Sequence, residues 1–308
     1  MASGRLIARA AKAEAQFILR SVDGQPRPRG KAAVLAAKAL ARLLLYLPIT
    51  LRLAQQLHRD APRCLLDHNP GVVLKHLRKG YARQLTAAER AAIVSHHYRQ
   101  FSRCLGPDFL DDLLREGVKI WAASDDVMGP RIIAKSTDHY DFESELVLVF
   151  MLGAEVLYIM GCVFSPGEIW GVDDESVLVI TRVQGIRLAV DKMKMATELC
   201  GDCAPRLLLF SAMEGVLAAM QIRGIVGVGV TRQIATEFET ITTHSFHDNY
   251  DGLWLSLNAQ PQPDGNFRLP TPLVQRPLAT IPAKHRGRTQ ARRTYRHIVT
   301  TAVASYFV

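Results

Sequence analysis

The distribution of apolar residues changes at Val118, and this change constrains the fold more than any other feature of the sequence. Before Val118, apolar residues are spread through long segments rich in Ala, Leu and Arg, as in helices. After it, they fall into short runs separated by polar residues or by Gly and Pro, which is typical of a meander of antiparallel strands. These runs are 118–123, 131–135, 145–152, 155–164 and 176–183.

The pattern changes again after Gln184 and Gly185. The sequence then predicts helices over 187–199 and 206–223, a strand over 225–230, a short helix over 250–257 and a strand over 267–269. This succession favours an α+β fold, in which a helical N-terminal region is followed by a mixed sheet layered with helices.

The first 60 residues are expected to form two helices, 5–20 and 31–59, because the linker 23–30 is too rich in Gly and Pro to remain helical. Pro48 should kink or end the second helix. The segment 71–116 is also expected to be helical, with a helix starting at the capping-box sequence Thr86-Ala87-Ala88-Glu89. We therefore divide the chain into a basic helical arm (1–66), a helical subdomain (67–117), an α+β domain (118–283) and a basic C-terminal helix (284–308).

Positive charge is concentrated at the two ends of the chain. Residues 1–66 carry twelve Lys and Arg against three acidic residues, and the segment 284–297 carries six against none. The net charge of the whole chain is +9, which leaves −6 on the remaining residues. Such asymmetry indicates an anionic partner, either a membrane surface or RNA, or basic ends that dock on the acidic body.

The basic residues of the C-terminal segment follow a helical spacing. Lys284, Arg288, Arg292 and Arg296 are four residues apart, so they would form one stripe that repels itself unless an anion or an acidic surface neutralises it. The sequence leaves two alternatives open, namely docking on the acidic body or binding the phosphate groups of a ligand, a lipid or RNA.

Other patterns exclude several classes of protein. The apolar run 43–51 is too short to cross a bilayer, charged residues interrupt any secretory signal, and five sparse cysteines fit a reducing compartment. We therefore expect a cytoplasmic protein that associates peripherally with the inner membrane where its basic ends bind lipid. The sequence also lacks the motifs of P-loop NTPases, of α/β-hydrolases with a nucleophile elbow and of zincin metalloproteases, so it gives these classes no support. Cys200 and Cys203, and the short polar loop 244–248, are interpreted as structural, so no metal site is expected.

Several short motifs occur in a recognisable order between about residues 76 and 297. They are His76 and Tyr81, Thr86 to Arg90, His96-His97-Tyr98, Glu143 to Leu146, Gln184-Gly185, Pro205 to Leu209, Asn249 to Trp254, Phe267 to Pro270 and the basic run from Lys284. Together they resemble the VirK/YbjX family of bacterial proteins, whose biochemical function is largely unknown. The family's acidic motif usually has a glycine where this chain has Ser144, and its Arg-Pro order is inverted at Pro205-Arg206. The resemblance implies a link to virulence, surface proteins and resistance to antimicrobial peptides.

The predicted order of strand 176–183, helix 206–223, strand 225–230 and helix 250–257 also resembles the core of GNAT-type acyltransferases, as a fold analogy. In that fold, amides at a helix N-terminus hold the pyrophosphate of an acyl carrier. The analogy implies contacts with the carrier by Gln184, Gly185, Gly201 and Arg206, and the basic stripe adds Lys284, Arg288 and Arg292.

Three residues are candidates for catalysis. Glu143 and Glu145 are two apart in a predicted strand, so they would share one face, and their repulsion could raise one pKa into the range of a general base. The alternative is an exposed strand face with two solvated acids. Tyr250, the first residue of the predicted short helix, is the third candidate.

Two functional hypotheses follow. The first is an acyl- or aminoacyl-transferase that acts on envelope lipid, peptide or a small molecule, with acyl-CoA, acyl carrier protein or aminoacyl-tRNA as the donor. The second is a non-catalytic, membrane-associated cytoplasmic factor in virulence or envelope stress.

Overall fold

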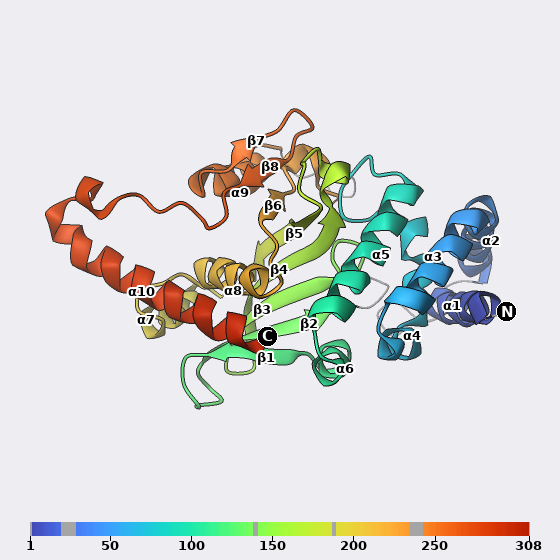
Figure 1. Cartoon of the computed structure of the whole chain (residues 1–308), viewed down its shortest axis with the longest axis horizontal. Helices are drawn as coiled ribbons and strands as arrows, with labels where there is room; N and C mark the ends of the chain where they lie inside the picture. Colours follow the sequence, from blue (N-terminus) through green and yellow to red (C-terminus); the bar gives the residue numbers. More distant parts are fainter. Residues whose placement is uncertain (1, 20–28, 138–140, 187–188, 235–242, 308) are drawn as a thin grey trace.

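The computed structural model describes residues 2–19, 29–137, 141–186, 189–234 and 243–307 (Figure 1). Its centre is an eight-stranded sheet of order β1-β2-β3-β4-β5-β6-β8-β7. The strands are β1 (Val118–Ala122), β2 (Pro130–Ser136), β3 (Leu146–Leu152), β4 (Glu155–Pro166), β5 (Ser176–Gly185), β6 (Gly224–Gly227), β7 (Gln260–Pro261) and β8 (Phe267–Leu269). The α+β class and the helical N-terminal region predicted from the sequence are thus confirmed.

The strands β1 to β5 form the predicted antiparallel meander, and the tight turn at Gly153 and Ala154 joins β3 to β4. Only β5 and β6 pair in parallel within the described sheet. A parallel pair needs a crossover, which α7 (Val190–Leu199) and α8 (Pro205–Ala219) provide. The chain then returns through α9 (Thr243–Ser256) to the antiparallel strands β7 and β8.

Two long helices cover part of the sheet. The helix α8 is largely apolar because it lies between strands β3 to β5 and the C-terminal helix α10 (Ala283–Tyr306). Gly215 of α8 permits this approach, since a Cβ there would lie 2.5 Å from the carbonyl oxygen of Thr300. Val299 and Val303 anchor the C-terminal half of α10, whereas its first turns stand away from the sheet (Figure 1).

The N-terminal region, up to Arg115, is helical and lies beside the sheet (Figure 1). It comprises α1 (Ala2–Leu19), α2 (Arg29–Leu45), α3 (Leu47–Asp60), α4 (Arg63–His68), the 3-10 helix η1 (Pro70–Leu77), α5 (Ala87–Cys104) and α6 (Pro107–Arg115). The predicted capping box is present, because Thr86 and Glu89 satisfy each other's backbone amides at the start of α5. The chain turns by 78° between α2 and α3, next to Pro48. Within the described residues, no single helix has the length and apolar character needed to cross a membrane.

Packing accounts for the differences from the predicted elements. The strand predicted over 225–230 ends at Gly227, where the ring of Trp254 packs against the backbone. The helix predicted over 250–257 begins at Thr243, so residues 244–248 form a helix rather than the expected polar loop; their side chains lie outside the described ones. The edge strand β7, with only two residues, was not predicted.

The contact between α8 and α10 is tested by replacing Gly215 with alanine. The added methyl group would meet the backbone of α10, so we expect the free energy of unfolding to fall by about 1–3 kcal/mol, the usual cost of overpacking. The control is Gly287→Ala in the exposed N-terminal part of α10, where a Cβ meets no atom within 4 Å. Urea unfolding that shows equal stability for both variants would contradict this packing.

Candidate functional site

A buried ion pair joins the helical N-terminal region to the sheet. Lys75, in η1, lies 2.7 Å from the carboxylate of Glu145, which directly precedes β3, and both side chains are excluded from solvent. Buried charges are costly unless they are paired and fully hydrogen-bonded. Glu145 meets this requirement, because the hydroxyl groups of Tyr81 and Tyr98 donate to its two oxygens. The pKa values of both tyrosines are raised by burial and by the adjacent carboxylate.

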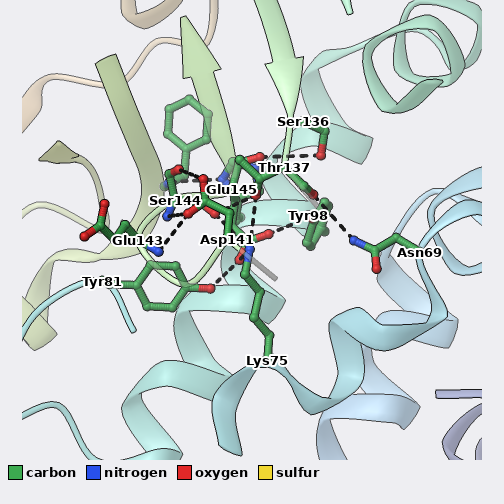
Figure 2. A network of polar contacts seen from close by, with 12 residues as sticks. Asn69, Lys75, Tyr81, Tyr98, Ser136, Thr137, Asp141, Glu143, Ser144 and Glu145 are labelled. Atoms are coloured by element: carbon green, nitrogen blue, oxygen red, sulfur yellow. Dashed lines mark hydrogen bonds and ion pairs between the residues drawn. The ribbon is translucent and has the colours of Figure 1, made fainter. Parts of the chain in front are cut away.

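The ammonium group of Lys75 has further partners in the same network (Figure 2). It donates to the carbonyl oxygen of Ser144 at 2.8 Å and to the hydroxyl of Thr137 at 3.1 Å. The hydroxyl of Thr137 itself donates to the carbonyl of Ser144. The backbone that leads into β3 is therefore held at a fixed position by a side chain almost 70 residues earlier in the chain.

The same loop presents two carboxylates to an arginine of β5. Asp141 accepts hydrogen bonds from the backbone amides of Glu143 and Ser144, which folds the loop back on itself. Arg182 lies 3.2 Å from Asp141 and 3.3 Å from Glu143, and all three side chains are about three-quarters buried. Burial raises the pKa of Glu143, and Asp141 raises it further, whereas Arg182 opposes the shift. Glu143 is thus a carboxylate with a raised pKa near the surface.

The pairing of β5 with β6 ends next to this acidic loop. Their pairing runs from Val177 and Gly224 to Ile180 and Gly227, and one further bond joins the Val228 amide to Ile180. Beyond that point, residues 182–185 of β5 remain paired with β4 but not with β6. The strand β6 is therefore paired along its whole length and ends at Gly227, whereas β5 continues for five residues beyond this pairing.

The helix α9 contacts the chain just after β6 and the continuing part of β5. The indole nitrogen of Trp254 donates to the carbonyl of Val228 at 3.1 Å. One turn earlier, Tyr250 forms a hydrogen bond with the backbone of Val183 on the unpaired edge of β5. The pKa of Tyr250 is raised to about 12, chiefly by burial, and Glu143 is among the groups that act on it electrostatically. Tyr250 is therefore a protonated phenol near a carboxylate with a raised pKa.

A second tyrosine extends this cluster toward α8. Tyr158 of β4 is opposite Gly185 of β5, and its hydroxyl forms a hydrogen bond with Arg206 in the first turn of α8. Gly185 is needed there, because a Cβ would lie 2.9 Å from the ring of Tyr158. We call Asp141, Glu143, Tyr158, Arg182, Arg206 and Tyr250 the β5 cluster.

The structure separates the residues that were predicted to contact a carrier. Gly185 and Arg206 lie at the β5 cluster, and the exposed Gln184 precedes Gly185. Gly201, however, lies against the ring of Tyr295 in α10, and the neighbouring Asp202 is 2.7 Å from Arg288.

The basic stripe of α10 docks in part on the acidic body. Besides the Arg288 pair with Asp202, Arg296 lies 3.7 Å from Glu214 and donates to the hydroxyl of Ser211. Arg292 is half-buried, and Lys284 is exposed at the start of the helix. Of the two alternatives for the stripe, docking therefore accounts for Arg288 and Arg296.

The predicted pairing of Glu143 with Glu145 is wrong. Both residues precede β3, which begins at Leu146, and they have different surroundings. Glu145 points toward Lys75 (Figure 2), whereas Glu143 pairs with Arg182. Repulsion between the two carboxylates therefore does not explain the raised pKa of Glu143, which burial explains. Glu145 is a structural residue in this arrangement.

Cys200 and Cys203 lie against α10, where Cys203 donates to the carbonyl of Arg292 and Cys200 forms a hydrogen bond with Tyr295. Cys200 and Cys203 are buried, and burial raises the pKa of Cys200 to about 11. Among the residues that the structure describes, no group of His, Cys, Asp and Glu could hold a metal ion.

Several residues of the site were not identified from the sequence. Lys75, Asp141, Tyr158 and Arg182 are single polar residues in unrelated segments, so no local spacing connects them. The only signal was compositional, since Lys75 and Arg182 are charged residues within otherwise apolar runs.

Comparison with known proteins identifies a family but no activity. A family model described as a protein of unknown function (DUF535) matches residues 30–302. Because this match covers most of the chain, the chain belongs to that family, which includes the VirK/YbjX proteins that its motifs resemble. No curated protein and no solved structure matches the chain significantly.

The buried ion pair is tested with Glu145→Gln. This change leaves the charge of Lys75 buried without a counter-charge, so we expect the free energy of unfolding to fall by about 3–5 kcal/mol. Glu143→Gln is the matched control, because this pair keeps some contact with solvent and Arg182 retains Asp141 as a partner, so the loss should be clearly smaller. Urea unfolding measures both.

Neutralising both partners separates the charge effect from the loss of shape. Lys75→Met combined with Glu145→Gln should be more stable than Glu145→Gln alone, because no unpaired charge remains buried. A double variant that is less stable than either single variant would contradict the account.

Proposed function

We propose that this member of the DUF535 family transfers an acyl or aminoacyl group, and that transfer occurs at the β5 cluster. One observation carries the proposal. The strand β6 ends at Gly227 whereas β5 continues past Ile180, and the edge of β5 beyond the end of β6 lies beside Glu143 and Tyr250. This arrangement supports the analogy with GNAT-type acyltransferases, in which the donor lies between two diverging parallel strands.

The edge of β5 suits an extended donor. Apart from the Val183 backbone group that is hydrogen-bonded to Tyr250, residues 181–185 offer backbone groups that are not paired with β6, and an extended chain of amides can add to such an edge like a further strand. At the end of this edge, Arg206 stands in the first turn of α8, where the helix dipole favours an anion. A donor with amides at one end and phosphate at the other fits both features. Acyl-CoA and acyl carrier protein have this chemistry, and aminoacyl-tRNA shares the phosphate.

Two titratable groups of the cluster, Glu143 and Tyr250, can take complementary roles in proton transfer. Glu143, with its raised pKa, would accept the proton of an acceptor amine or hydroxyl group as that group attacks the carbonyl carbon of the donor. Tyr250, which remains protonated, would give its proton to the departing thiolate or ribose oxygen. Arg182 would position Glu143 and moderate its pKa.

The acceptor that we propose is an envelope lipid, a peptide or a small molecule, in keeping with the family's association with the bacterial surface. A second candidate is a non-catalytic factor that associates with the membrane and contributes to virulence or envelope stress. The exposed apolar residues of α2 favour it.

The proposed function is tested by donor consumption. The protein is incubated with a panel of acyl-CoA thioesters and with labelled aminoacyl-tRNA, in the presence of amine acceptors, and release of thiol or of deacylated tRNA is measured. We expect turnover of one donor class, and we expect Glu143→Gln to lower kcat by about 100-fold or more, as is usual for loss of a general base. Because the pKa of Glu143 is raised, activity should fall with decreasing pH at a higher pH than an ordinary glutamate would require.

The control is Glu168→Gln, a carboxylate in the 3-10 helix η2 (Gly167–Trp170) and outside the β5 cluster, which should retain full turnover. Turnover that is unaffected by Glu143→Gln would contradict the assignment of the base. Failure of every donor to bind in calorimetry would leave the non-catalytic candidate in its place.

A further inference from the structure

The helix α2 turns an apolar face away from the body of the protein. Val34, Leu44 and Leu45 are 54, 62 and 71% exposed. At 100° per residue they fall on one side of the helix, together with the exposed alanines 33, 37 and 41. Single exposed leucines are ordinary on a protein surface, but a continuous apolar face on one helix indicates an interaction site.

The opposite side of α2 rests loosely on the protein. Ala32 is buried and Leu43 is half-buried, whereas Ala36 and Ala39 line an apolar cavity of about 240 Å³ between α2, α1 and η1. Leu74 and Leu77 form the other wall of this cavity. The helix α2 therefore packs on the protein around an unfilled cavity. A partner that covers its outward face would stabilise its position further.

Charge indicates what that partner is. Lys38 and Arg42 are both exposed beside the apolar face, and residues 29–45 contain no acidic residue. Two copies of this helix would bring like charges together across their interface, which opposes self-association. Anionic lipid headgroups would instead pair with the two cations while the acyl chains cover the leucines.

The geometry favours a helix that lies on the membrane rather than one that crosses it. The helix α2 has 17 residues, and the chain bends by 78° before α3. The helix α3 cannot continue a span, because Leu53, Ala54 and Leu57 are buried in the protein core. We propose that α2 docks the protein on an anionic bilayer, with the helix axis in the plane of the membrane and its outward face among the acyl chains. This inference does not depend on the transfer activity.

The test uses the full chain and vesicles of phosphatidylcholine with or without phosphatidylglycerol. We expect the protein to sediment with the anionic vesicles and much less with the neutral ones. Leu44→Gln combined with Leu45→Gln should weaken the binding at least about tenfold, because two apolar side chains no longer enter the bilayer. Lys38→Gln combined with Arg42→Gln should also weaken it and should reduce its dependence on salt.

The matched control is Val190→Ser combined with Met195→Ser, which removes two equally exposed apolar side chains from α7. It should bind vesicles like the parent, and all variants should keep the parent's melting temperature. Vesicle binding that survives the leucine substitutions would overturn the proposal. So would a leucine variant that only shifts the sedimentation coefficient from dimer to monomer, because the face would then bind a second copy.

Discussion

The buried ion pair between Lys75 and Glu145 is the interaction on which the rest of the arrangement depends. A carboxylate with no access to solvent must have partners for both oxygens, and here they come from η1, α5 and the segment between them. The segment that leads into β3 can therefore occupy only one position relative to the helical N-terminal region. Any shift of that segment would leave at least one charge buried without a partner, which costs several kcal/mol.

This constraint extends from the core to the surface. With Glu145 fixed inside, the preceding residues turn outward, and Asp141 and Glu143 meet Arg182 on β5. The parallel pairing of β5 and β6 stops two residues before Arg182, and α9 brings Tyr250 to the open edge. The helical N-terminal region thus contributes no residue to the β5 cluster but determines where the acidic loop of this cluster lies. Chemistry at this cluster would depend on helices that never touch the substrate.

The sequence predicted elements well and the site poorly, for a physical reason. The spacing of apolar residues and the residues that cap a helix are local features of the sequence. The meander, the break at Pro48 and the start of α5 at Thr86 could therefore all be predicted. Glu143, Arg206 and Tyr250 were each named from the sequence as candidate site residues, and the fold brings them to one cluster, but their roles stay predictions. The separate fates of Glu143 and Glu145 could not be predicted, because Lys75, Tyr81 and Tyr98 are 47 to 70 residues away in the chain. Likewise, only the folded chain shows that Asp202 and Glu214 neutralise part of the basic stripe.

The central claim is that a donor adds to the edge of β5 beyond the end of β6. Hydrogen–deuterium exchange of the whole chain, with and without acetyl-CoA and a non-hydrolysable aminoacyl-tRNA analogue, tests it most directly. The account predicts that one of these donors slows exchange in peptides covering residues 181–185 and the first turn of α8. Protection confined to α10 by a donor that binds, with unchanged exchange at 181–185, would contradict it.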